Sequence, residues 1–222
     1  MADPVKYEAV IFDLDGTLLD TLADLSDSMN AALRQLGFPT HDKEEYRYFV
    51  GDGMGTLARR VLPPDRCDEA TVTRSIQLMS AEYNCRWNVK TKPYPGIEEL
   101  LDELEAAGMQ MAVFSNKPDA FTKMMIPALL PRWNFYPVLG ARPGVPVKPN
   151  PQGAVEITKI LGIAPERFLY VGDTNTDMRT ATAAGIYAVG VTWGFRKIEE
   201  LLEHGAKSII QRPSDLMKLL DA

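Results

Sequence analysis

The chain has 222 residues, of which 45% are hydrophobic and 24% are charged, a composition typical of globular proteins. Its formal net charge of −6 argues against a basic surface that would bind nucleic acid or anionic membranes. The two cysteines, Cys67 and Cys85, lack metal-ligand spacing and are too few for a disulfide framework, so we expect reduced thiols. The first residues do not resemble a signal peptide and no apolar run would span a bilayer, which favours a cytoplasmic location.

The chain begins with one strand and continues into a long helical segment. Residues 9–12 are a β-branched and aromatic run that predicts a strand buried on both faces. Apolar residues then recur at helical spacing through 25–36, around 57–61 and through 72–83, with no comparable strand between them. We therefore expect an all-helical insert over residues 20–90.

Beyond residue 93, apolar strands alternate with helices. The pattern predicts strands at residues 111–114, 137–139, 168–171, 187–191 and 208–210, and helices at 97–107, 119–130, 152–161, 177–184 and from 214 onward. Such alternation is typical of an α/β fold with a doubly wound parallel sheet and helices on both faces. The predicted organisation is a core of residues 1–19 and 91–222, with a small helical domain of residues 20–90 inserted after the first strand.

Polar side chains gather where these predicted strands end. In an open α/β sheet, the carboxyl ends of the strands share one edge, and ligands bind there. Separate stretches of the chain should therefore bring their polar groups together at this edge: Asp13 and Asp15 after the first strand, Ser115 and Asn116 after 111–114, and Asp173 and Asp177 after 168–172.

Each of these groups also has a plainer interpretation. Asp15-Gly16 is a common turn pair, and Asp177 is well placed to cap the following helix. Asp173, directly after an apolar strand, has no such local role. Lys148 lies between prolines that stiffen its backbone, although most lysines are solvated surface charges. Paired carboxylates at a strand–helix junction are the oxygen ligands that Mg²⁺ prefers.

Taken together, the groups resemble the motifs of a known superfamily. Four segments match, in order, the motifs of the haloacid dehalogenase superfamily, and the helical insert resembles its C1-type cap: Asp13-Leu14-Asp15-Gly16-Thr17-Leu18, Ser115-Asn116-Lys117, Lys148-Pro149 and Gly172-Asp173-x-x-x-Asp177. The segments 49–57 and 209–216 are most similar to those of the phosphoglycolate phosphatase group. The resemblance covers the whole chain and implies a Rossmann-like core.

This resemblance implies a Mg²⁺-dependent phosphatase acting on a small phosphate monoester, with phosphoglycolate the best guess. Asp13 would attack phosphorus to form an aspartyl phosphate, and Asp15 would act as general acid and then base. The Asp13 side chain, the Asp15 backbone carbonyl and Asp173 would hold the metal, with Asp177 acting through water or by orienting Lys148. Phosphate and substrate contacts are expected from Thr17, Ser115, Asn116, Lys148 and Gly53, with fixing of the loop as the alternative role of Thr17. One Mg²⁺ and a protonated Lys148 would neutralise Asp13, Asp15 and Asp173.

Several alternatives remain open from the sequence. The acid at Asp15 favours phosphoryl chemistry over halide displacement, and the glycine-rich segment 51–55 favours hydrolysis over a phosphomutase reaction. Pyrophosphate, sugar phosphates and nucleotides are other candidate substrates, and Arg59, Arg60 and Lys43 are candidates for a substrate carboxylate or plain surface charges. A receiver-like signalling domain and a non-catalytic binding protein are rivals of other classes. The sequence leaves monomer and homodimer equally open.

Overall fold

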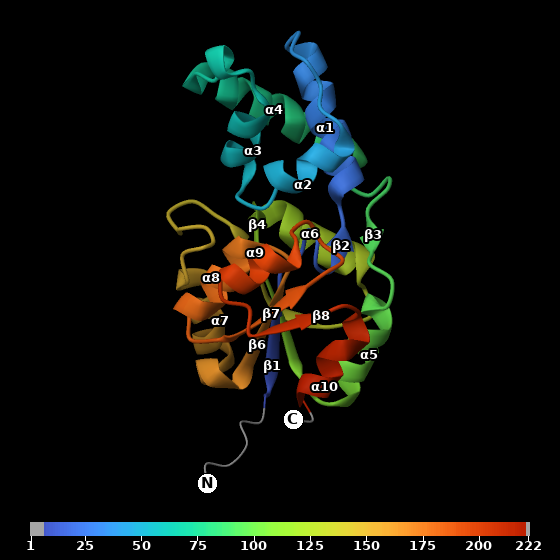
Figure 1. The fold of residues 1–222 in the computed structure, drawn as a ribbon. Coiled ribbons are helices and arrows are strands. Elements are labelled where there is room, and N and C mark those ends of the chain that lie inside the picture. Colours follow the sequence, from blue (N-terminus) through green and yellow to red (C-terminus); the bar gives the residue numbers. More distant parts are fainter. Residues whose placement is uncertain (1–6, 221–222) are drawn as a thin grey trace.

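A parallel β-sheet forms the centre of the structure, a computed structural model that describes residues 7–220 (Figure 1). Within this range its six strands lie in the order β5-β4-β1-β6-β7-β8. The chain builds outward from β1 on one side and then crosses to the other, so the strand order reverses beside β1. The strands are β1 (Ala9–Phe12), β4 (Gln110–Pro118), β5 (Phe135–Ala141), β6 (Phe168–Gly172), β7 (Tyr187–Val191) and β8 (Ser208–Ile210).

Helices cover both faces of this sheet, and β1 shows why. Because side chains alternate along a strand, Val10 and Phe12 pack into one apolar cluster while Ala9 and Ile11 pack into another on the opposite face. The first cluster contains residues of α5 (Ile97–Ala106), α6 (Asp119–Leu129) and the C-terminal segment that leads into α10 (Met217–Leu220). The second contains residues of α7 (Gln152–Leu161), α8 (Asn175–Ala183) and α9 (Ile198–Glu203).

A helical bundle formed within residues 20–90 lies over the edge of the sheet at which β1 ends (Figure 1). Its own apolar cluster joins α1 (Leu22–Gln35), α2 (Tyr46–Phe49), α3 (Met54–Val61) and α4 (Glu69–Arg86). The two connections to the core pair with each other as short antiparallel strands, β2 (Leu19–Asp20) and β3 (Lys92–Pro93). Two-residue strands carry no periodicity, so the sequence did not predict them.

The parallel α/β fold is confirmed, with local corrections. The strand predicted at 111–114 runs on to Pro118, so Ser115 and Asn116 lie within β4 rather than after it. Polar residues ended the apolar run, but the backbone pairing with β5 continues past them. Helix α9 was not predicted because six residues are too few to show helical periodicity. Within residues 7–220, no helix combines the length and apolarity needed to cross a membrane.

Candidate active site

Asp13 follows β1 directly and is almost fully buried at the centre of the sheet edge. Its amide donates a hydrogen bond of 2.9 Å to the Val171 carbonyl of β6, so its backbone continues the sheet. The chain then turns sharply at Gly16, whose φ of 92° favours glycine. A Cβ atom at Gly16 would lie 2.3 Å from Asp173 Oδ2, so this turn also leaves space for a second carboxylate.

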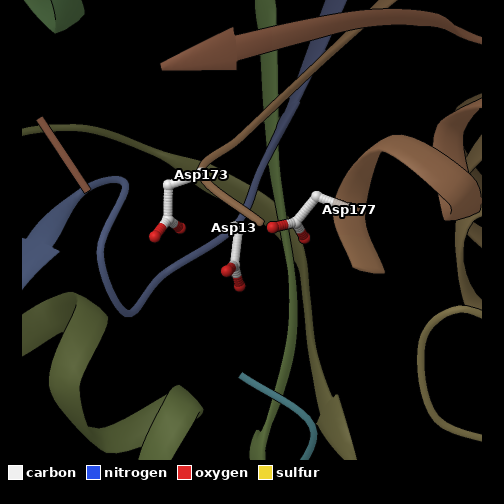
Figure 2. Close-up of side chains that lie close together, drawn as sticks. All are labelled: Asp13, Asp173 and Asp177. Atoms are coloured by element: carbon white, nitrogen blue, oxygen red, sulfur yellow. The ribbon is translucent and has the colours of Figure 1, made fainter. Parts of the chain in front are cut away.

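Three carboxylates meet at this edge. Asp13, Asp173 and Asp177 each place an oxygen within 4.8 Å of the others, and all three are buried (Figure 2). Figure 2 shows their carboxylates lying close together although the residues come from two separate segments of the chain. This convergence is the one expected of strand ends that share an edge, because β1 and β6 are adjacent parallel strands.

Lys148 supplies positive charge to these three carboxylates through Asp13 and Asp177. Its Nζ lies 2.8 Å from Asp13 Oδ1 and 2.7 Å from Asp177 Oδ1, and it donates a 3.1 Å hydrogen bond to the Phe114 carbonyl. Asp13 Oδ1 is therefore held by a short ion pair with a buried ammonium.

Asp173 is held on both of its carboxylate oxygens. The Thr17 hydroxyl donates to Oδ1 over 2.9 Å, and the Phe195 amide donates to Oδ2 over 2.8 Å. Thr17 is therefore engaged with a carboxylate in this structure, which agrees with a loop-fixing role. The Phe195 amide, from the loop after β7, had no signal in the sequence.

Asp177 has both of the roles that the sequence left open, at the start of α8 and beside Lys148. Its Oδ2 accepts hydrogen bonds from the Thr174 amide (3.1 Å) and hydroxyl (2.6 Å), so it forms a capping box with Thr174, the N-cap residue of α8. Its other oxygen contacts Lys148. The same carboxylate thus fixes a helix and orients a buried lysine.

The pKa values at this group indicate a shortage of positive charge. Burial, and then repulsion from Asp177, raises the pKa of Asp13 well above its usual range, although Lys148 opposes this. Burial and the Asp177 charge raise the pKa of Asp173 to about 7. Three carboxylates against one ammonium leave two negative charges, which a single divalent cation would neutralise. The all-oxygen ligand set of Asp13, Asp173 and Asp177 suits Mg²⁺.

Asp15 has a partner that the sequence analysis did not assign. Lys117 Nζ lies 3.0 Å from Asp15 Oδ1 and 3.1 Å from Oδ2, and 4.6 Å from the centre of the Tyr83 ring. Burial alone would lower the pKa of Lys117, but the charge and hydrogen-bond contributions of Asp15 and Tyr83 together outweigh burial and raise the pKa. The predicted strand ended at residue 114, whereas β4 continues to Pro118, so the burial of Lys117 had no signal beyond its place in the motif.

The remaining predicted residues lie around a cavity between the sheet edge and the bundle. Ser115, Asn116 and Gly53 line it together with Asp13 and Asp15. The Asn116 side chain is already engaged: its amide nitrogen donates to the carbonyls of Gly51 and Lys148, each over 3.0 Å, and its oxygen accepts from the Lys148 amide over 2.8 Å. Asn116 therefore holds the Lys148 segment and the bundle in place.

Further contacts join the bundle to the core. Arg196 donates to the backbone carbonyls of Val50, over 3.0 Å, and Arg47, and Arg47 donates to the Gly194 carbonyl over 2.7 Å. Neither arginine was singled out in the sequence. The three bundle residues considered as partners for a substrate carboxylate form ion pairs with acidic residues of the bundle instead. Arg59 pairs with Glu69, Arg60 with Asp52 and Lys43 with Glu44.

Known proteins resemble this chain in both sequence and fold. The sequence model of the haloacid dehalogenase-like hydrolase family matches residues 10–191. A phosphoglycolate phosphatase of Aquifex aeolicus is 31% identical over 96% of both chains, and one of Pseudomonas syringae pv. tomato is 31% identical over 95% of this chain and 78% of its own. A solved structure from Lactobacillus delbrueckii subsp. bulgaricus has a TM-score of 0.90 at 31% identity, covering 97% of this chain and 98% of its own.

These matches and the carboxylate–lysine site agree on one class. The chain belongs to the haloacid dehalogenase-like hydrolase family, and within that family it is a phosphatase acting on phosphoric monoesters.

Proposed function

We propose that this phosphatase hydrolyses phosphoglycolate, depends on Mg²⁺ and proceeds through an aspartyl phosphate on Asp13. The observation that carries the proposal is the position of Asp13: buried at the sheet edge, beside Lys148 and two further carboxylates, and lining the cavity together with Asp15. The relatives named phosphoglycolate phosphatase support the choice of substrate.

The metal would be held by the side chains of Asp13 and Asp173 and the backbone carbonyl of Asp15. When bound, Mg²⁺ would supply the two positive charges that the three carboxylates and Lys148 lack, and so permit a phosphate dianion to approach. Lys148, fixed by Asp177, would stabilise charge on the phosphoryl oxygens. The Ser115 hydroxyl and backbone amides around Gly53 would complete the phosphate contacts, while Thr17 would keep Asp173 aimed at the site.

In the first step, an Asp13 oxygen would bond to phosphorus as the bond to the ester oxygen breaks. Asp15 would give its proton to that departing oxygen. In the second step, Asp15 would take a proton from a water molecule, the water oxygen would bond to phosphorus, and the Asp13–phosphorus bond would break. Asp15 lines the same cavity as Asp13, which suits both proton transfers.

A panel of phosphate esters tests the proposal. Purified protein with Mg²⁺ should show its highest kcat/KM on phosphoglycolate when compared with pyrophosphate, sugar phosphates and nucleoside monophosphates. Preference for another ester would replace the proposed substrate. A stable phosphoprotein without turnover on any ester would instead favour the receiver-like interpretation.

A further inference from the structure

The cavity above Asp13 has mostly apolar walls and a single cation. Its apolar lining comes from the bundle and the start of α6: Leu25, Val50, Met54, Leu57, Tyr83 and Phe121. Among the described residues that line it, Lys117 is the only positively charged one. The cavity has a volume of about 50 Å³, which suits a leaving group of a few atoms rather than a nucleoside.

Lys117 is buried to an unusual degree for a lysine. Only 6% of the residue is exposed, and its ammonium rests between the Asp15 carboxylate and the face of the Tyr83 ring. Burying a lysine is costly unless its charge is satisfied. In apolar surroundings, a second anion placed beside this ammonium would also interact more strongly than it would in water.

We propose that Lys117 determines substrate specificity by binding a carboxylate on the leaving group. This inference rests on the proposed function, because it concerns the part of the substrate beyond the phosphoryl group. The surface cations Arg59, Arg60 and Lys43 do not line the cavity, whereas Lys117 does. Lys117 is therefore the best placed of these cations to meet a substrate carboxylate.

The geometry of the Asp15–Lys117 pair matches a short hydroxyacid. Asp15 must reach the ester oxygen, and Lys117 Nζ lies 3.0 and 3.1 Å from the two Asp15 oxygens. In a leaving group such as glycolate, the ester oxygen and the nearest carboxylate oxygen are about 3 Å apart, given ordinary bond lengths. One substrate can thus contact Asp15 through its ester oxygen and Lys117 through its carboxylate.

Two esters of equal length separate recognition from positioning. Phosphoglycolate and 2-hydroxyethyl phosphate differ in whether the leaving group ends in a carboxylate or a neutral hydroxyl. In Lys117→Met, kcat/KM for phosphoglycolate relative to that for 2-hydroxyethyl phosphate should fall by about 10- to 100-fold. This is the size expected for losing one charged hydrogen bond. The loss on phosphoglycolate should appear largely in KM, and Lys117→Arg should recover part of the ratio.

The controls distinguish the ways in which this inference can fail. Lys123→Met makes the same substitution at an exposed lysine paired with Asp119, and should leave the ratio unchanged. If Lys117→Met lowers kcat equally on both esters, Lys117 acts only by positioning Asp15 and the inference is overturned. If the wild type hydrolyses p-nitrophenyl phosphate but does not prefer phosphoglycolate, the proposed substrate is wrong before any variant is compared.

Discussion

Asp52 of the helical bundle accepts a hydrogen bond from the Thr176 hydroxyl of the core, with 2.6 Å between the two oxygens. The other Asp52 oxygen pairs with Arg60 within the bundle, also at 2.6 Å. The bond links the segment that carries Gly53 to the helix that carries Asp177. It therefore connects the position of the bundle to the position of the carboxylate group.

Breaking this bond should weaken closure of the bundle over the substrate. Thr176→Val and Asp52→Ala should each raise KM for phosphoglycolate by about 3- to 10-fold, and their effects should couple by about 1 kcal/mol in a double-mutant cycle. Losses on p-nitrophenyl phosphate should be smaller, since the core contacts the phosphoryl group that every ester shares. Arg59→Ala, on the bundle surface, is the matched control. Additive effects, or equal losses on both esters, would mean that the bond supports only the fold.

Substitution of Asp13 and substitution of Asp15 should impair the reaction in different ways. Asp13→Asn should abolish the covalent intermediate, whereas Asp15→Asn should slow both chemical steps by about 10²–10⁴-fold, as is typical of general acid–base groups. Beryllofluoride, which mimics an aspartyl phosphate, should bind at Asp13 in the wild type. Crystallography or ¹⁹F NMR of the adduct would check this, and an adduct on another aspartate would refute the assignment of the nucleophile.

Removal of divalent cations should stop turnover. The three carboxylates and Lys148 carry a net charge of about −2 once ionised, which would repel a phosphate dianion. EDTA should abolish hydrolysis of every ester, and Mg²⁺ should restore it, as measured by phosphate release. Full activity after exhaustive chelation would rule out the proposed charge balance.

The affinity for Mg²⁺ should fall below neutral pH. Because the pKa of Asp173 is about 7, protons compete with the metal at lower pH, and Mg²⁺ should bind about 10-fold more weakly at pH 6 than at pH 7.5–8. The stability of the metal-free protein should change with pH in the opposite direction to the Mg²⁺ affinity. An acid whose pKa is raised by folding favours the folded state at low pH, so the metal-free protein should lose stability as the pH rises through 7.

Thermal unfolding with and without Mg²⁺ at pH 6, 7 and 8 measures both effects. The increase in Tm caused by Mg²⁺ should grow with pH in the wild type, and Asp173→Asn should remove most of this dependence. A metal-free Tm that rises between pH 6 and pH 8 would contradict the prediction.

Gly194 should be needed to leave room for Asp173. A Cβ atom there would lie 2.2 Å from the Asp173 Cβ, a distance that forces the carboxylate to move. Gly194→Ala should therefore destabilise the fold by about 1–3 kcal/mol, as overpacking does, and weaken Mg²⁺ binding in calorimetry. Gly55→Ala, which meets open space, is the control and should change neither quantity appreciably. Normal Mg²⁺ binding by Gly194→Ala would show that the site tolerates the shift.

The sequence by itself determined the α/β architecture and the carboxylate group. Runs such as 9–12 and 168–171 are apolar on both faces and must be buried, so they become interior strands of the sheet. Parallel strands end at one edge, and Asp13, Asp173 and Asp177 follow from that rule with no knowledge of contacts. These are local signals combined with one topological principle.

Only the tertiary structure decided how side chains from distant segments pair. Lys117 and Asp15 are 102 residues apart in sequence, and their contact depends on the register of β4 and on the rotamers that burial permits. The same holds for the Asn116 amide, the Phe195 amide and the Asp52–Thr176 bond. Each of these joins separate segments of the chain, either within the core or between the core and the bundle, and hydrophobic periodicity contains no information about how their side chains meet.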